Sequence, residues 1–392
     1  MARSHNVSLT IAGVPVTTWD EIAITHDLFS PAGAYTVTLW READASRWNE
    51  VRRACRIFAP VIVEVDGAVQ LRGTLERIKA GGNRSGAPLT LSGRSLAGPA
   101  MVAHVDPRIS LRGVTLVEAL TRIFAPLGIA VTVGVSAEEA RSVMAGARPG
   151  PVRTGTRRRA HHRVDRFRLK PGQTVWQAAE MLCRRHGYLL YAAPTSDGLG
   201  LVIDRPAYDS PVQHALSRTK VDVGADGLTT WTGNVLEGFR DVNGTDAQTI
   251  TTVFGHSGLD APQDARHRGV VSNERLLYHP LVSDVIVERP HYLRDSRART
   301  PQIAEQRARR ENALTMADFD TYNATVQGFA QGSPARVWTI NSMVHVRDEL
   351  ALLDEDWLTT SVTFTRSREG GHTTRLRLVP KDSIVIDPDP EV

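Results

Sequence analysis

The first hundred residues alternate apolar and polar positions in short runs, separated by Gly, Pro, Asp and Ser. This period of two is typical of half-buried antiparallel strands. Within residues 61–80, Asp66-Gly67 separates two alternating runs, which predicts a hairpin because Gly allows the positive φ of a tight turn. Short strands are best closed into a small barrel or a compact sandwich, since unpaired edges invite aggregation. We therefore expect a first β-barrel domain over residues 1–98.

The period changes to that of a helix near residue 115. Thr115 and Glu118 have the spacing of a capping box, and the apolar residues that follow recur on one helical face until Gly128. The same pattern returns at Thr174 and Gln177, with a helix that we expect to end at Gly187. In both segments a Gly precedes the capping Thr by two positions, so the two stretches look like one module used twice.

Each copy is interpreted as a strand, a helix and a second strand, over residues 109–133 and 167–191. In that arrangement the apolar stripe of the helix is buried against a sheet. After Gly187 the pattern predicts two strands joined by a turn around Asp197-Gly198. Residues 99–220 are thus predicted to form an α/β region.

The segment 169–187 also resembles the start of the peptidoglycan-binding LysM module, because it reads PGxTxxxxA at its helix start. A LysM module would continue with a second short helix, whereas this chain continues with strands. A peptidoglycan-binding or lytic tail protein is kept as the alternative function. Pull-down on purified sacculi would test this alternative directly.

The last third returns to strands, and we expect a second β-barrel domain over residues 221–382 with an insertion at about 256–300. Thr300-Pro301 marks a helix start, and Glu305 and Arg309 form a favourable pair at helical spacing. Alternation is nearly strict from 358 to 379, with Gly370-Gly371 as the turn. An acidic tail follows at 383–392. The predicted fold class is therefore α+β, mainly β, with two small barrels flanking an α/β region.

Charge adds one candidate feature. The net charge is +4, but only four of the 47 basic residues are Lys, a bias that a GC-rich genome explains. Pro, Gly and Arg dominate 141–166, which predicts a mobile loop. Arg157, Arg158, Arg159 and Arg163 could neutralise phosphates, although no aromatic residues are interleaved for base stacking. In a DNA-binding protein, deleting residues 150–163 should abolish a salt-sensitive shift of duplex DNA.

Cysteine usage and hydropathy exclude several classes. Cys55 and Cys183 are far apart and lack CxxC spacing, so they predict buried reduced thiols rather than a disulfide framework or a zinc site. No apolar run has the length of a signal peptide or a membrane span. We expect a protein made in the cytoplasm and not inserted in a membrane.

A search for catalytic spacing predicts no catalytic, cofactor-binding or metal-binding residue. GHSGL around Ser257 lacks the second small Gly of a nucleophile elbow, and His161-His162 has no further ligand nearby. GLGL at 198–201 is interpreted as part of a hairpin rather than a dinucleotide loop. The carboxylates of 348–356 are interpreted as a solvated acidic loop. We expect a protein that is not an enzyme and has no cofactor.

The order of the parts resembles the baseplate hub proteins of contractile-tailed bacteriophages, the family of the phage Mu P protein. The similar stretches are 7–39, 65–78, 91–106, 169–203, 307–314 and 338–383. In the last of these, Asn341, Val344 and Val346 match a recurrent NxxVxV. The Arg-rich segment 145–166 is not part of that pattern.

The resemblance implies a homotrimer in which two barrel domains per chain give a pseudo-sixfold ring. Such a ring would join the hexameric tail tube, or a tube-proximal ring, to the trimeric central spike. It also implies the sheath initiator, wedge proteins and tape measure protein as partners, and a channel that DNA crosses without specific binding. The implied location is the baseplate of the virion tail, assembled in the host cytoplasm.

Overall fold

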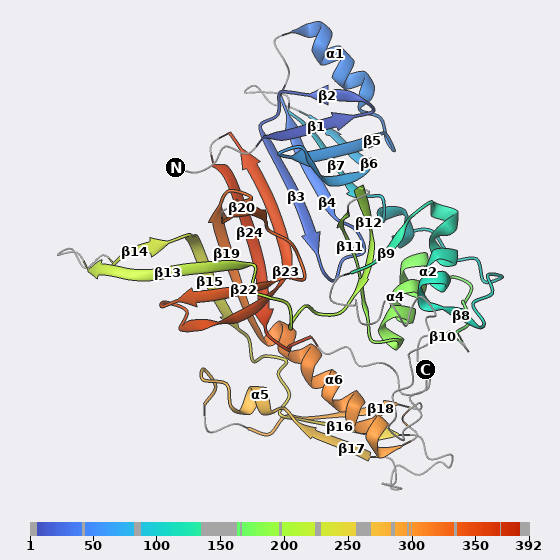
Figure 1. The fold of residues 1–392 in the computed structure, drawn as a ribbon, viewed down its shortest axis with the longest axis vertical. Coiled ribbons are helices and arrows are strands. Elements are labelled where there is room, and N and C mark those ends of the chain that lie inside the picture. Colours follow the sequence, from blue (N-terminus) through green and yellow to red (C-terminus); the bar gives the residue numbers. More distant parts are fainter. Residues whose placement is uncertain are drawn as a thin grey trace.

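The computed structural model describes residues 6–40, 44–81, 88–134, 163–164, 167–195, 198–223, 229–255, 268–283, 287–295, 298, 300–332, 335–368 and 370–384. Two β bodies lie side by side, with a body of helices and strands beside them and a small helix-and-sheet unit below (Figure 1). The expected mainly-β, α+β class is confirmed.

The N-terminal body holds seven strands and one helix, and its inward positions are the apolar ones of the sequence pattern. Asp66 and Gly67 both have positive φ, so the predicted hairpin is confirmed. The sheet order is β3-β4-β7-β6-β5-β1-β2. The elements are β1 (Val7–Ile11), β2 (Val14–Val16), β3 (Glu21–Asp27), β4 (Ala34–Leu39), α1 (Ala45–Ala54), β5 (Pro60–Val65), β6 (Ala68–Ala80) and β7 (Leu89–Ser95).

The C-terminal body holds seven main strands in the order β15-β19-β24-β23-β22-β13-β14. A long helix, α6 (Pro301–Phe319), begins after Thr300, whose hydroxyl accepts from the backbone N–H of Ile303, as the sequence predicts. The strands are β13 (His214–Val223), β14 (Thr229–Gly233), β15 (Val235–Val242), β19 (Asp320–Gln327), β22 (Met343–Asp348), β23 (Leu353–Ser367) and β24 (Gly371–Pro380), with a short pair β20 (Ala330–Gln331) and β21 (Arg336–Val337). β13 crosses the domain boundary expected at residue 220.

The two bodies share one topology. When the two sheets are compared from β3 and from β15 onward, strands at equivalent positions have the same rank in the chain order of their own body. Five of the six equivalent strand pairings are antiparallel in both bodies. The exception is the pairing of β13 with β22, which is parallel where β1 with β5 is antiparallel. Buried Tyr35 and Tyr322 occupy the same register position in the two sheets.

The bodies are joined by direct strand pairing. β3 pairs antiparallel with the second half of β23, from Ser361 opposite Asp27 to Ser367 opposite Glu21. Both bodies consequently share one apolar core. The pairing of the described residues closes neither body into a barrel of its own, because the ladder continues from one into the other. The expected barrels are therefore two open units of one continuous sheet.

The middle region carries the two predicted helices. Both capping boxes are confirmed, at Thr115–Glu118 and at Thr174–Gln177. Gly128 and Gly187 follow the helices with positive φ, which a residue with a Cβ adopts only at a cost. The elements are η1 (Gly98–Met101), β8 (Val114–Thr115), α2 (Leu116–Phe124), η2 (Ala125–Leu127), β9 (Val131–Val133), β10 (Arg163–Val164), α4 (Val175–Arg185), β11 (Leu189–Thr195) and β12 (Gly198–Asp204).

The strands expected before the two helices are absent or very short in the structure. Residues 167–173 form no strand, and β8 has only two residues. The strands after the helices are confirmed, since β11 and β9 flank β12 in one three-stranded sheet. Buried side chains of α2 and α4 pack against that sheet, so the duplicated unit is a helix followed by a strand.

Most of the predicted Arg-rich loop, 141–166, lies outside the described residues. Residues 163–164 are an exception, because they form β10 against β8 and Val164 is buried. The loop prediction is wrong for these two positions. Residues 385–392 of the acidic tail are also outside the described residues, whereas Ser383 and Ile384 are buried.

The insertion expected at about 256–300 is part of a small sheet that begins before it. The sheet is made of β16 (Ile250–Gly255), β17 (Arg268–Ser272) and β18 (Pro290–Asp295), and α5 (Glu274–Leu277) lies within the expected insertion. The sheet packs on α6 through Val253, Ala304 and Ala308. At Gly269 a Cβ atom would lie 2.2 Å from the backbone nitrogen of Glu305. The sheet and helix therefore approach each other at backbone contact.

Candidate functional site

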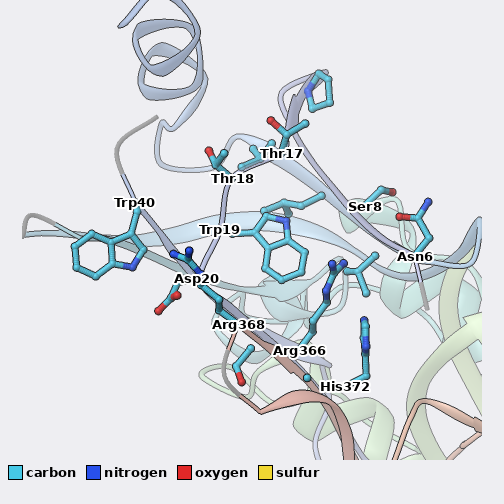
Figure 2. A pocket seen from close by; sticks show the side chains of 16 residues that line it. Asn6, Ser8, Thr17, Thr18, Trp19, Asp20, Trp40, Arg366, Arg368 and His372 are labelled. Atoms are coloured by element: carbon cyan, nitrogen blue, oxygen red, sulfur yellow. The ribbon is translucent and has the colours of Figure 1, made fainter. Parts of the chain in front are cut away.

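A cavity of about 920 Å³ lies where the two β bodies meet (Figure 2). Its walls come from β1, from the loop before β3 and from the turn between β23 and β24. The guanidinium of Arg366 lies 4.5 Å from the centroid of the Trp19 ring, and the backbone N–H of Arg368 donates to the carbonyl of Asp20 at 3.0 Å. These contacts tie the loop of one body to the hairpin of the other. The cavity is thus a seam between the bodies.

The acidic segment 348–356 differs from its prediction as a solvated loop. Asp348 is fully buried and forms a 2.7 Å ion pair with Arg218 of β13. The hydroxyl of Tyr322 donates to the same carboxylate. Burial, followed by the contact with Asp348, raises the pKa of Tyr322. Asp348 therefore connects three strands of the C-terminal body, and the prediction is wrong at this position.

A second buried ion pair joins β15 to β19. Arg240 donates to both carboxylate oxygens of Asp320, at 3.0 and 2.8 Å. Nε2 of His279, from the inserted region, lies 3.0 Å from the same carboxylate. The sequence search missed this cluster because its members are 80 and 41 residues apart from Asp320. It fixes the inserted region onto the β body.

Ser257, His161, His162 and Arg157 to Arg159 lie outside the described residues. The segment 198–201 opens β12 of a hairpin, as predicted. Within the part of the chain that the structure describes, no group of three His, Cys, Asp or Glu side chains could hold a metal ion. In that same part, no helix is long and apolar enough to cross a membrane.

The helix α4, which carried the resemblance to LysM, has its apolar face inside the protein. Val175, Ala178, Ala179 and Leu182 are all buried in the core shared with α2 and the β11-β12-β9 sheet. After Gly187 the chain enters β11, with no second helix. The apolar face of this segment is therefore used for folding.

The second face of the continuous sheet is a further candidate surface. One face of β3, β4, β7 and β23 is buried in the core, and the other carries mostly Ser and Thr side chains that are half-buried or exposed. Thr25 and Thr363 meet across the junction of the two bodies, with their hydroxyl oxygens 3.1 Å apart. The uncharged residues of this hydroxyl face are Ala23, Thr25, Ala34, Thr36, Thr38, Thr90, Ser92, Ser361, Thr363 and Thr365.

Comparison with known proteins finds a family model at each end of the chain. Residues 6–95 match the family model of the N-terminal domain of Mu phage baseplate assembly protein GpP-like proteins. Residues 300–387 match the model of the fourth domain of the Mu phage baseplate assembly protein GpP. The two ends of the chain are GpP-type baseplate domains. The resemblance to the Mu P family drawn from the sequence is confirmed.

Solved structures show the same fold over the whole chain. The 43 kDa tail protein of prophage MuSo2 from Shewanella oneidensis is 19% identical, with a TM-score of 0.72, and the match covers 97% of this chain and 100% of that one. A tail protein from Neisseria meningitidis is 20% identical, with a TM-score of 0.71 and 99% of both chains covered. No curated protein sequence matches this chain.

A more distant likeness extends to secretion machinery. A component of the type VI secretion system of E. coli, described as structurally similar to the bacteriophage T4 tail proteins gp27 and gp5, is 7% identical with a TM-score of 0.51. The match covers 97% of this chain and 79% of that one. At such identities the likeness is one of fold.

The two matches fall on the two β bodies, but β13, β14 and β15 of the C-terminal body precede the second match. The first model covers β1 to β7, and the fourth covers α6 and the strands β19 to β24. The chain is accordingly a structural protein of the phage baseplate class. Its candidate functional surfaces are those through which such a protein assembles: the hydroxyl face, and the free edges of the sheet.

Proposed function

We propose that this protein is the hub of a contractile-tail baseplate, in which three copies form a ring with pseudo-sixfold symmetry. The observation that carries this proposal is the repeated topology of the two β bodies in one chain. Two similar units per subunit allow three subunits to present six similar surfaces. The ring would connect a hexameric tail tube, or a tube-proximal ring, to a trimeric central spike.

The hydroxyl face supports a channel through the ring. It is continuous across the junction of the bodies and carries short, uncharged side chains at its centre. Cationic groups of this face, such as Arg94, Lys79, Arg375 and Arg377, lie at its borders, so its uncharged centre suits DNA that passes without specific binding. In this arrangement the apolar core faces away from the channel.

The proposed partners are those that the resemblance to baseplate hub proteins implies. The ends of the ring would contact the tube-side and spike-side proteins, and its periphery would contact the sheath initiator or wedge proteins. The tape measure protein would occupy the channel before DNA does. The protein would assemble in the host cytoplasm and reside in the baseplate of the virion tail, with a structural rather than an enzymatic role.

The first test is the mass of the purified protein in solution. We expect a trimer by native mass spectrometry and by light scattering, with subunit interfaces in the obligate class of about 2,000 Å² or more. A protein that stays monomeric at high concentration would refute the ring. Cryo-microscopy of intact tails would then show whether the hydroxyl face lines the channel.

A further inference from the structure

The chain contains one junction between its repeated units, and this junction provides a template. β3 pairs with the second half of β23, with Val362 opposite His26 on the core side and Thr363 opposite Thr25 on the hydroxyl face. The units are related by their shared topology, in which β15 corresponds to β3 and β6 corresponds to β23. A ring of similar units needs the same kind of junction between subunits.

The correspondence of β6 with β23 extends to individual hydrogen bonds. Both strands contain a bulge, between Leu75 and Arg77 in β6 and between Thr359 and Ser361 in β23. The backbone N–H of Phe58 donates to the carbonyl of Leu75 at 2.6 Å, while that of Asn341 donates to the carbonyl of Thr359 at 2.8 Å. The second half of β6 is therefore the counterpart of the half of β23 that receives β3.

Phe58 and Asn341 also share a left-handed backbone, with φ of 66° and 54°. Asn341 is 8% exposed, because its side chain is covered by residues 205–207 and Tyr191. Phe58 is 75% exposed. A bulky residue in this conformation is uncommon and costs energy. The equivalent position is thus buried by the same chain at Asn341 and exposed to solvent at Phe58.

The two segments that would form the second junction, β15 and the second half of β6, lack a second hydrogen-bonded strand within the described residues, although β12 contacts β6. Among the described residues, β15 has β19 as its only sheet partner, and β6 beyond Leu75 pairs only with β7. β15 exposes Leu236 and Phe239, at 55% and 65%. Long open edges with exposed apolar side chains are templates for pairing with another chain. In Figure 1 the two edges lie on either side of the β3–β23 pair.

We propose that β15 of one copy pairs antiparallel with the second half of β6 of the next copy, in the register of the internal junction. This inference rests on the proposed ring. Aligning the bulges places Ile78 opposite Val242, Lys79 opposite Asp241 and Ala80 opposite Arg240. The occupant of each edge is thus a second copy of this chain.

The side chains fit this register. At the proposed junction, Ile78 and Val242 occupy the core-side positions that Val362 and His26 hold at the internal junction, so two apolar side chains meet. On the hydroxyl face, the exposed Lys79 and Asp241 replace the Thr363–Thr25 pair, so opposite charges meet. Opposite charges directly across two strands stabilise the pairing. Lys79 is one of only four Lys residues in the chain.

The head-to-tail contact is compatible with a closed ring. It uses two different edges, so it is heterologous, and such contacts form a ring when their rotation closes and a filament when it does not. If the internal and external junctions are alike, the rotation between successive units is constant, and the proposed ring requires that six such rotations complete one turn. The eight strands from β15 through β23 and β3 to β6 then continue around the ring.

Charge reversal tests the register. We expect Lys79→Glu and Asp241→Lys each to raise the concentration at which half of the trimer dissociates by about tenfold or more, because each of three interfaces changes from attraction to repulsion. The double variant should restore most of the loss. Lys381→Glu, an exposed charge reversal at the far end of β24, is the matched control and should change nothing.

Cross-linking gives a second test with an internal control. Thr25→Cys with Thr363→Cys should form a disulfide within one chain, because the two hydroxyls are 3.1 Å apart. Lys79→Cys with Asp241→Cys should then give covalent dimers and trimers, and nothing larger.

Two experimental outcomes distinguish a failure of the proposed β15–β6 pairing from a failure of the proposed trimeric ring. A wild-type trimer that neither reversal weakens, or that does not cross-link while the internal control does, overturns this edge and leaves the ring standing. A wild-type monomer at all concentrations overturns both.

Discussion

His26 makes the junction between the two β bodies sensitive to acid. Its ring is on the core side of β3, opposite Val362, and it is 4% exposed. It packs edge-on against Phe364 at 6.3 Å, and neither ring nitrogen has a hydrogen-bond partner in the described part of the chain. A charged imidazolium has no favourable place there, and burial lowers the pKa of His26 to about 4.

The magnitude follows from proton linkage. In the unfolded chain the pKa is near its ordinary value of 6.5, so above pH 6.5 both states are neutral and stability does not change. As the pH falls from 6.5 to 4, the unfolded state binds a proton that the folded state excludes. At about 1.4 kcal/mol for each pH unit, the folded state loses roughly 3 kcal/mol by pH 4.

The variant His26→Leu should remove this loss. Urea unfolding of the wild type and the variant at pH 7.5 and pH 4 gives the free energy of unfolding of each. We expect the decrease between the two pH values to be about 3 kcal/mol smaller in the variant. An NMR titration of the imidazole should show the same lowered pKa directly.

His214 provides the matched control for this experiment. Burial also lowers its pKa, but it stacks on Trp338 at 4.2 Å, within the C-terminal body and away from the junction. His214→Leu should therefore leave the acid dependence caused by His26 in place. If His26→Leu and the wild type lose equal stability between pH 7.5 and pH 4, the reasoning from burial is refuted.

Four further substitutions test the fold. Asp348→Ala should destabilise the C-terminal body by about 3–5 kcal/mol in denaturant unfolding, because it leaves the Arg218 charge largely buried without its partner. Gly187→Ala should cost about 1 kcal/mol or more in thermal unfolding, because its φ of 77° disfavours a Cβ. Thr115→Ala and Thr174→Ala should each cost about 1 kcal/mol by the same measurement, and equal losses would match their equivalent capping boxes.

Local signals were predictable from the sequence because their causes lie within a few residues. The turn at Asp66-Gly67, the capping boxes at Thr115 and Thr174, and the helix start at Thr300 each depend on neighbours no more than three positions away. The structure confirms all of them. The α+β class follows from such signals taken together.

The buried charges were not predictable, because their partners are distant in sequence. The sequence around Asp348 is rich in acidic residues and is typical of a solvated segment. Its partner Arg218 is 130 positions away in sequence, so only the fold shows that the two form a buried ion pair. The missing strand at 167–173 has a related cause. Those residues alternate in sequence, but in the fold their strand-type pairing among the described residues is limited to the isolated bridge between Thr174 and His104, where the N–H of Val105 donates to the carbonyl of Gln173.

The repeat of the two β bodies shows what sequence comparison within one chain cannot detect. The corresponding strands β3 and β15 read EIAITHD and VLEGFRDV, which share no obvious pattern, and the second unit carries a sheet and a long helix between β15 and β19. The evidence for equivalence lies in backbone hydrogen bonds: the same strand order, the same bulge, and the same left-handed residue beside it. Backbone groups pair whatever their side chains are, so a junction between units can be kept while its contacts change from Thr–Thr to Lys–Asp. At the junction within one chain the contact needs no specificity, because the two β bodies are covalently connected and already close together. Where a unit meets another copy, opposite charges fix the register and exclude the wrong one.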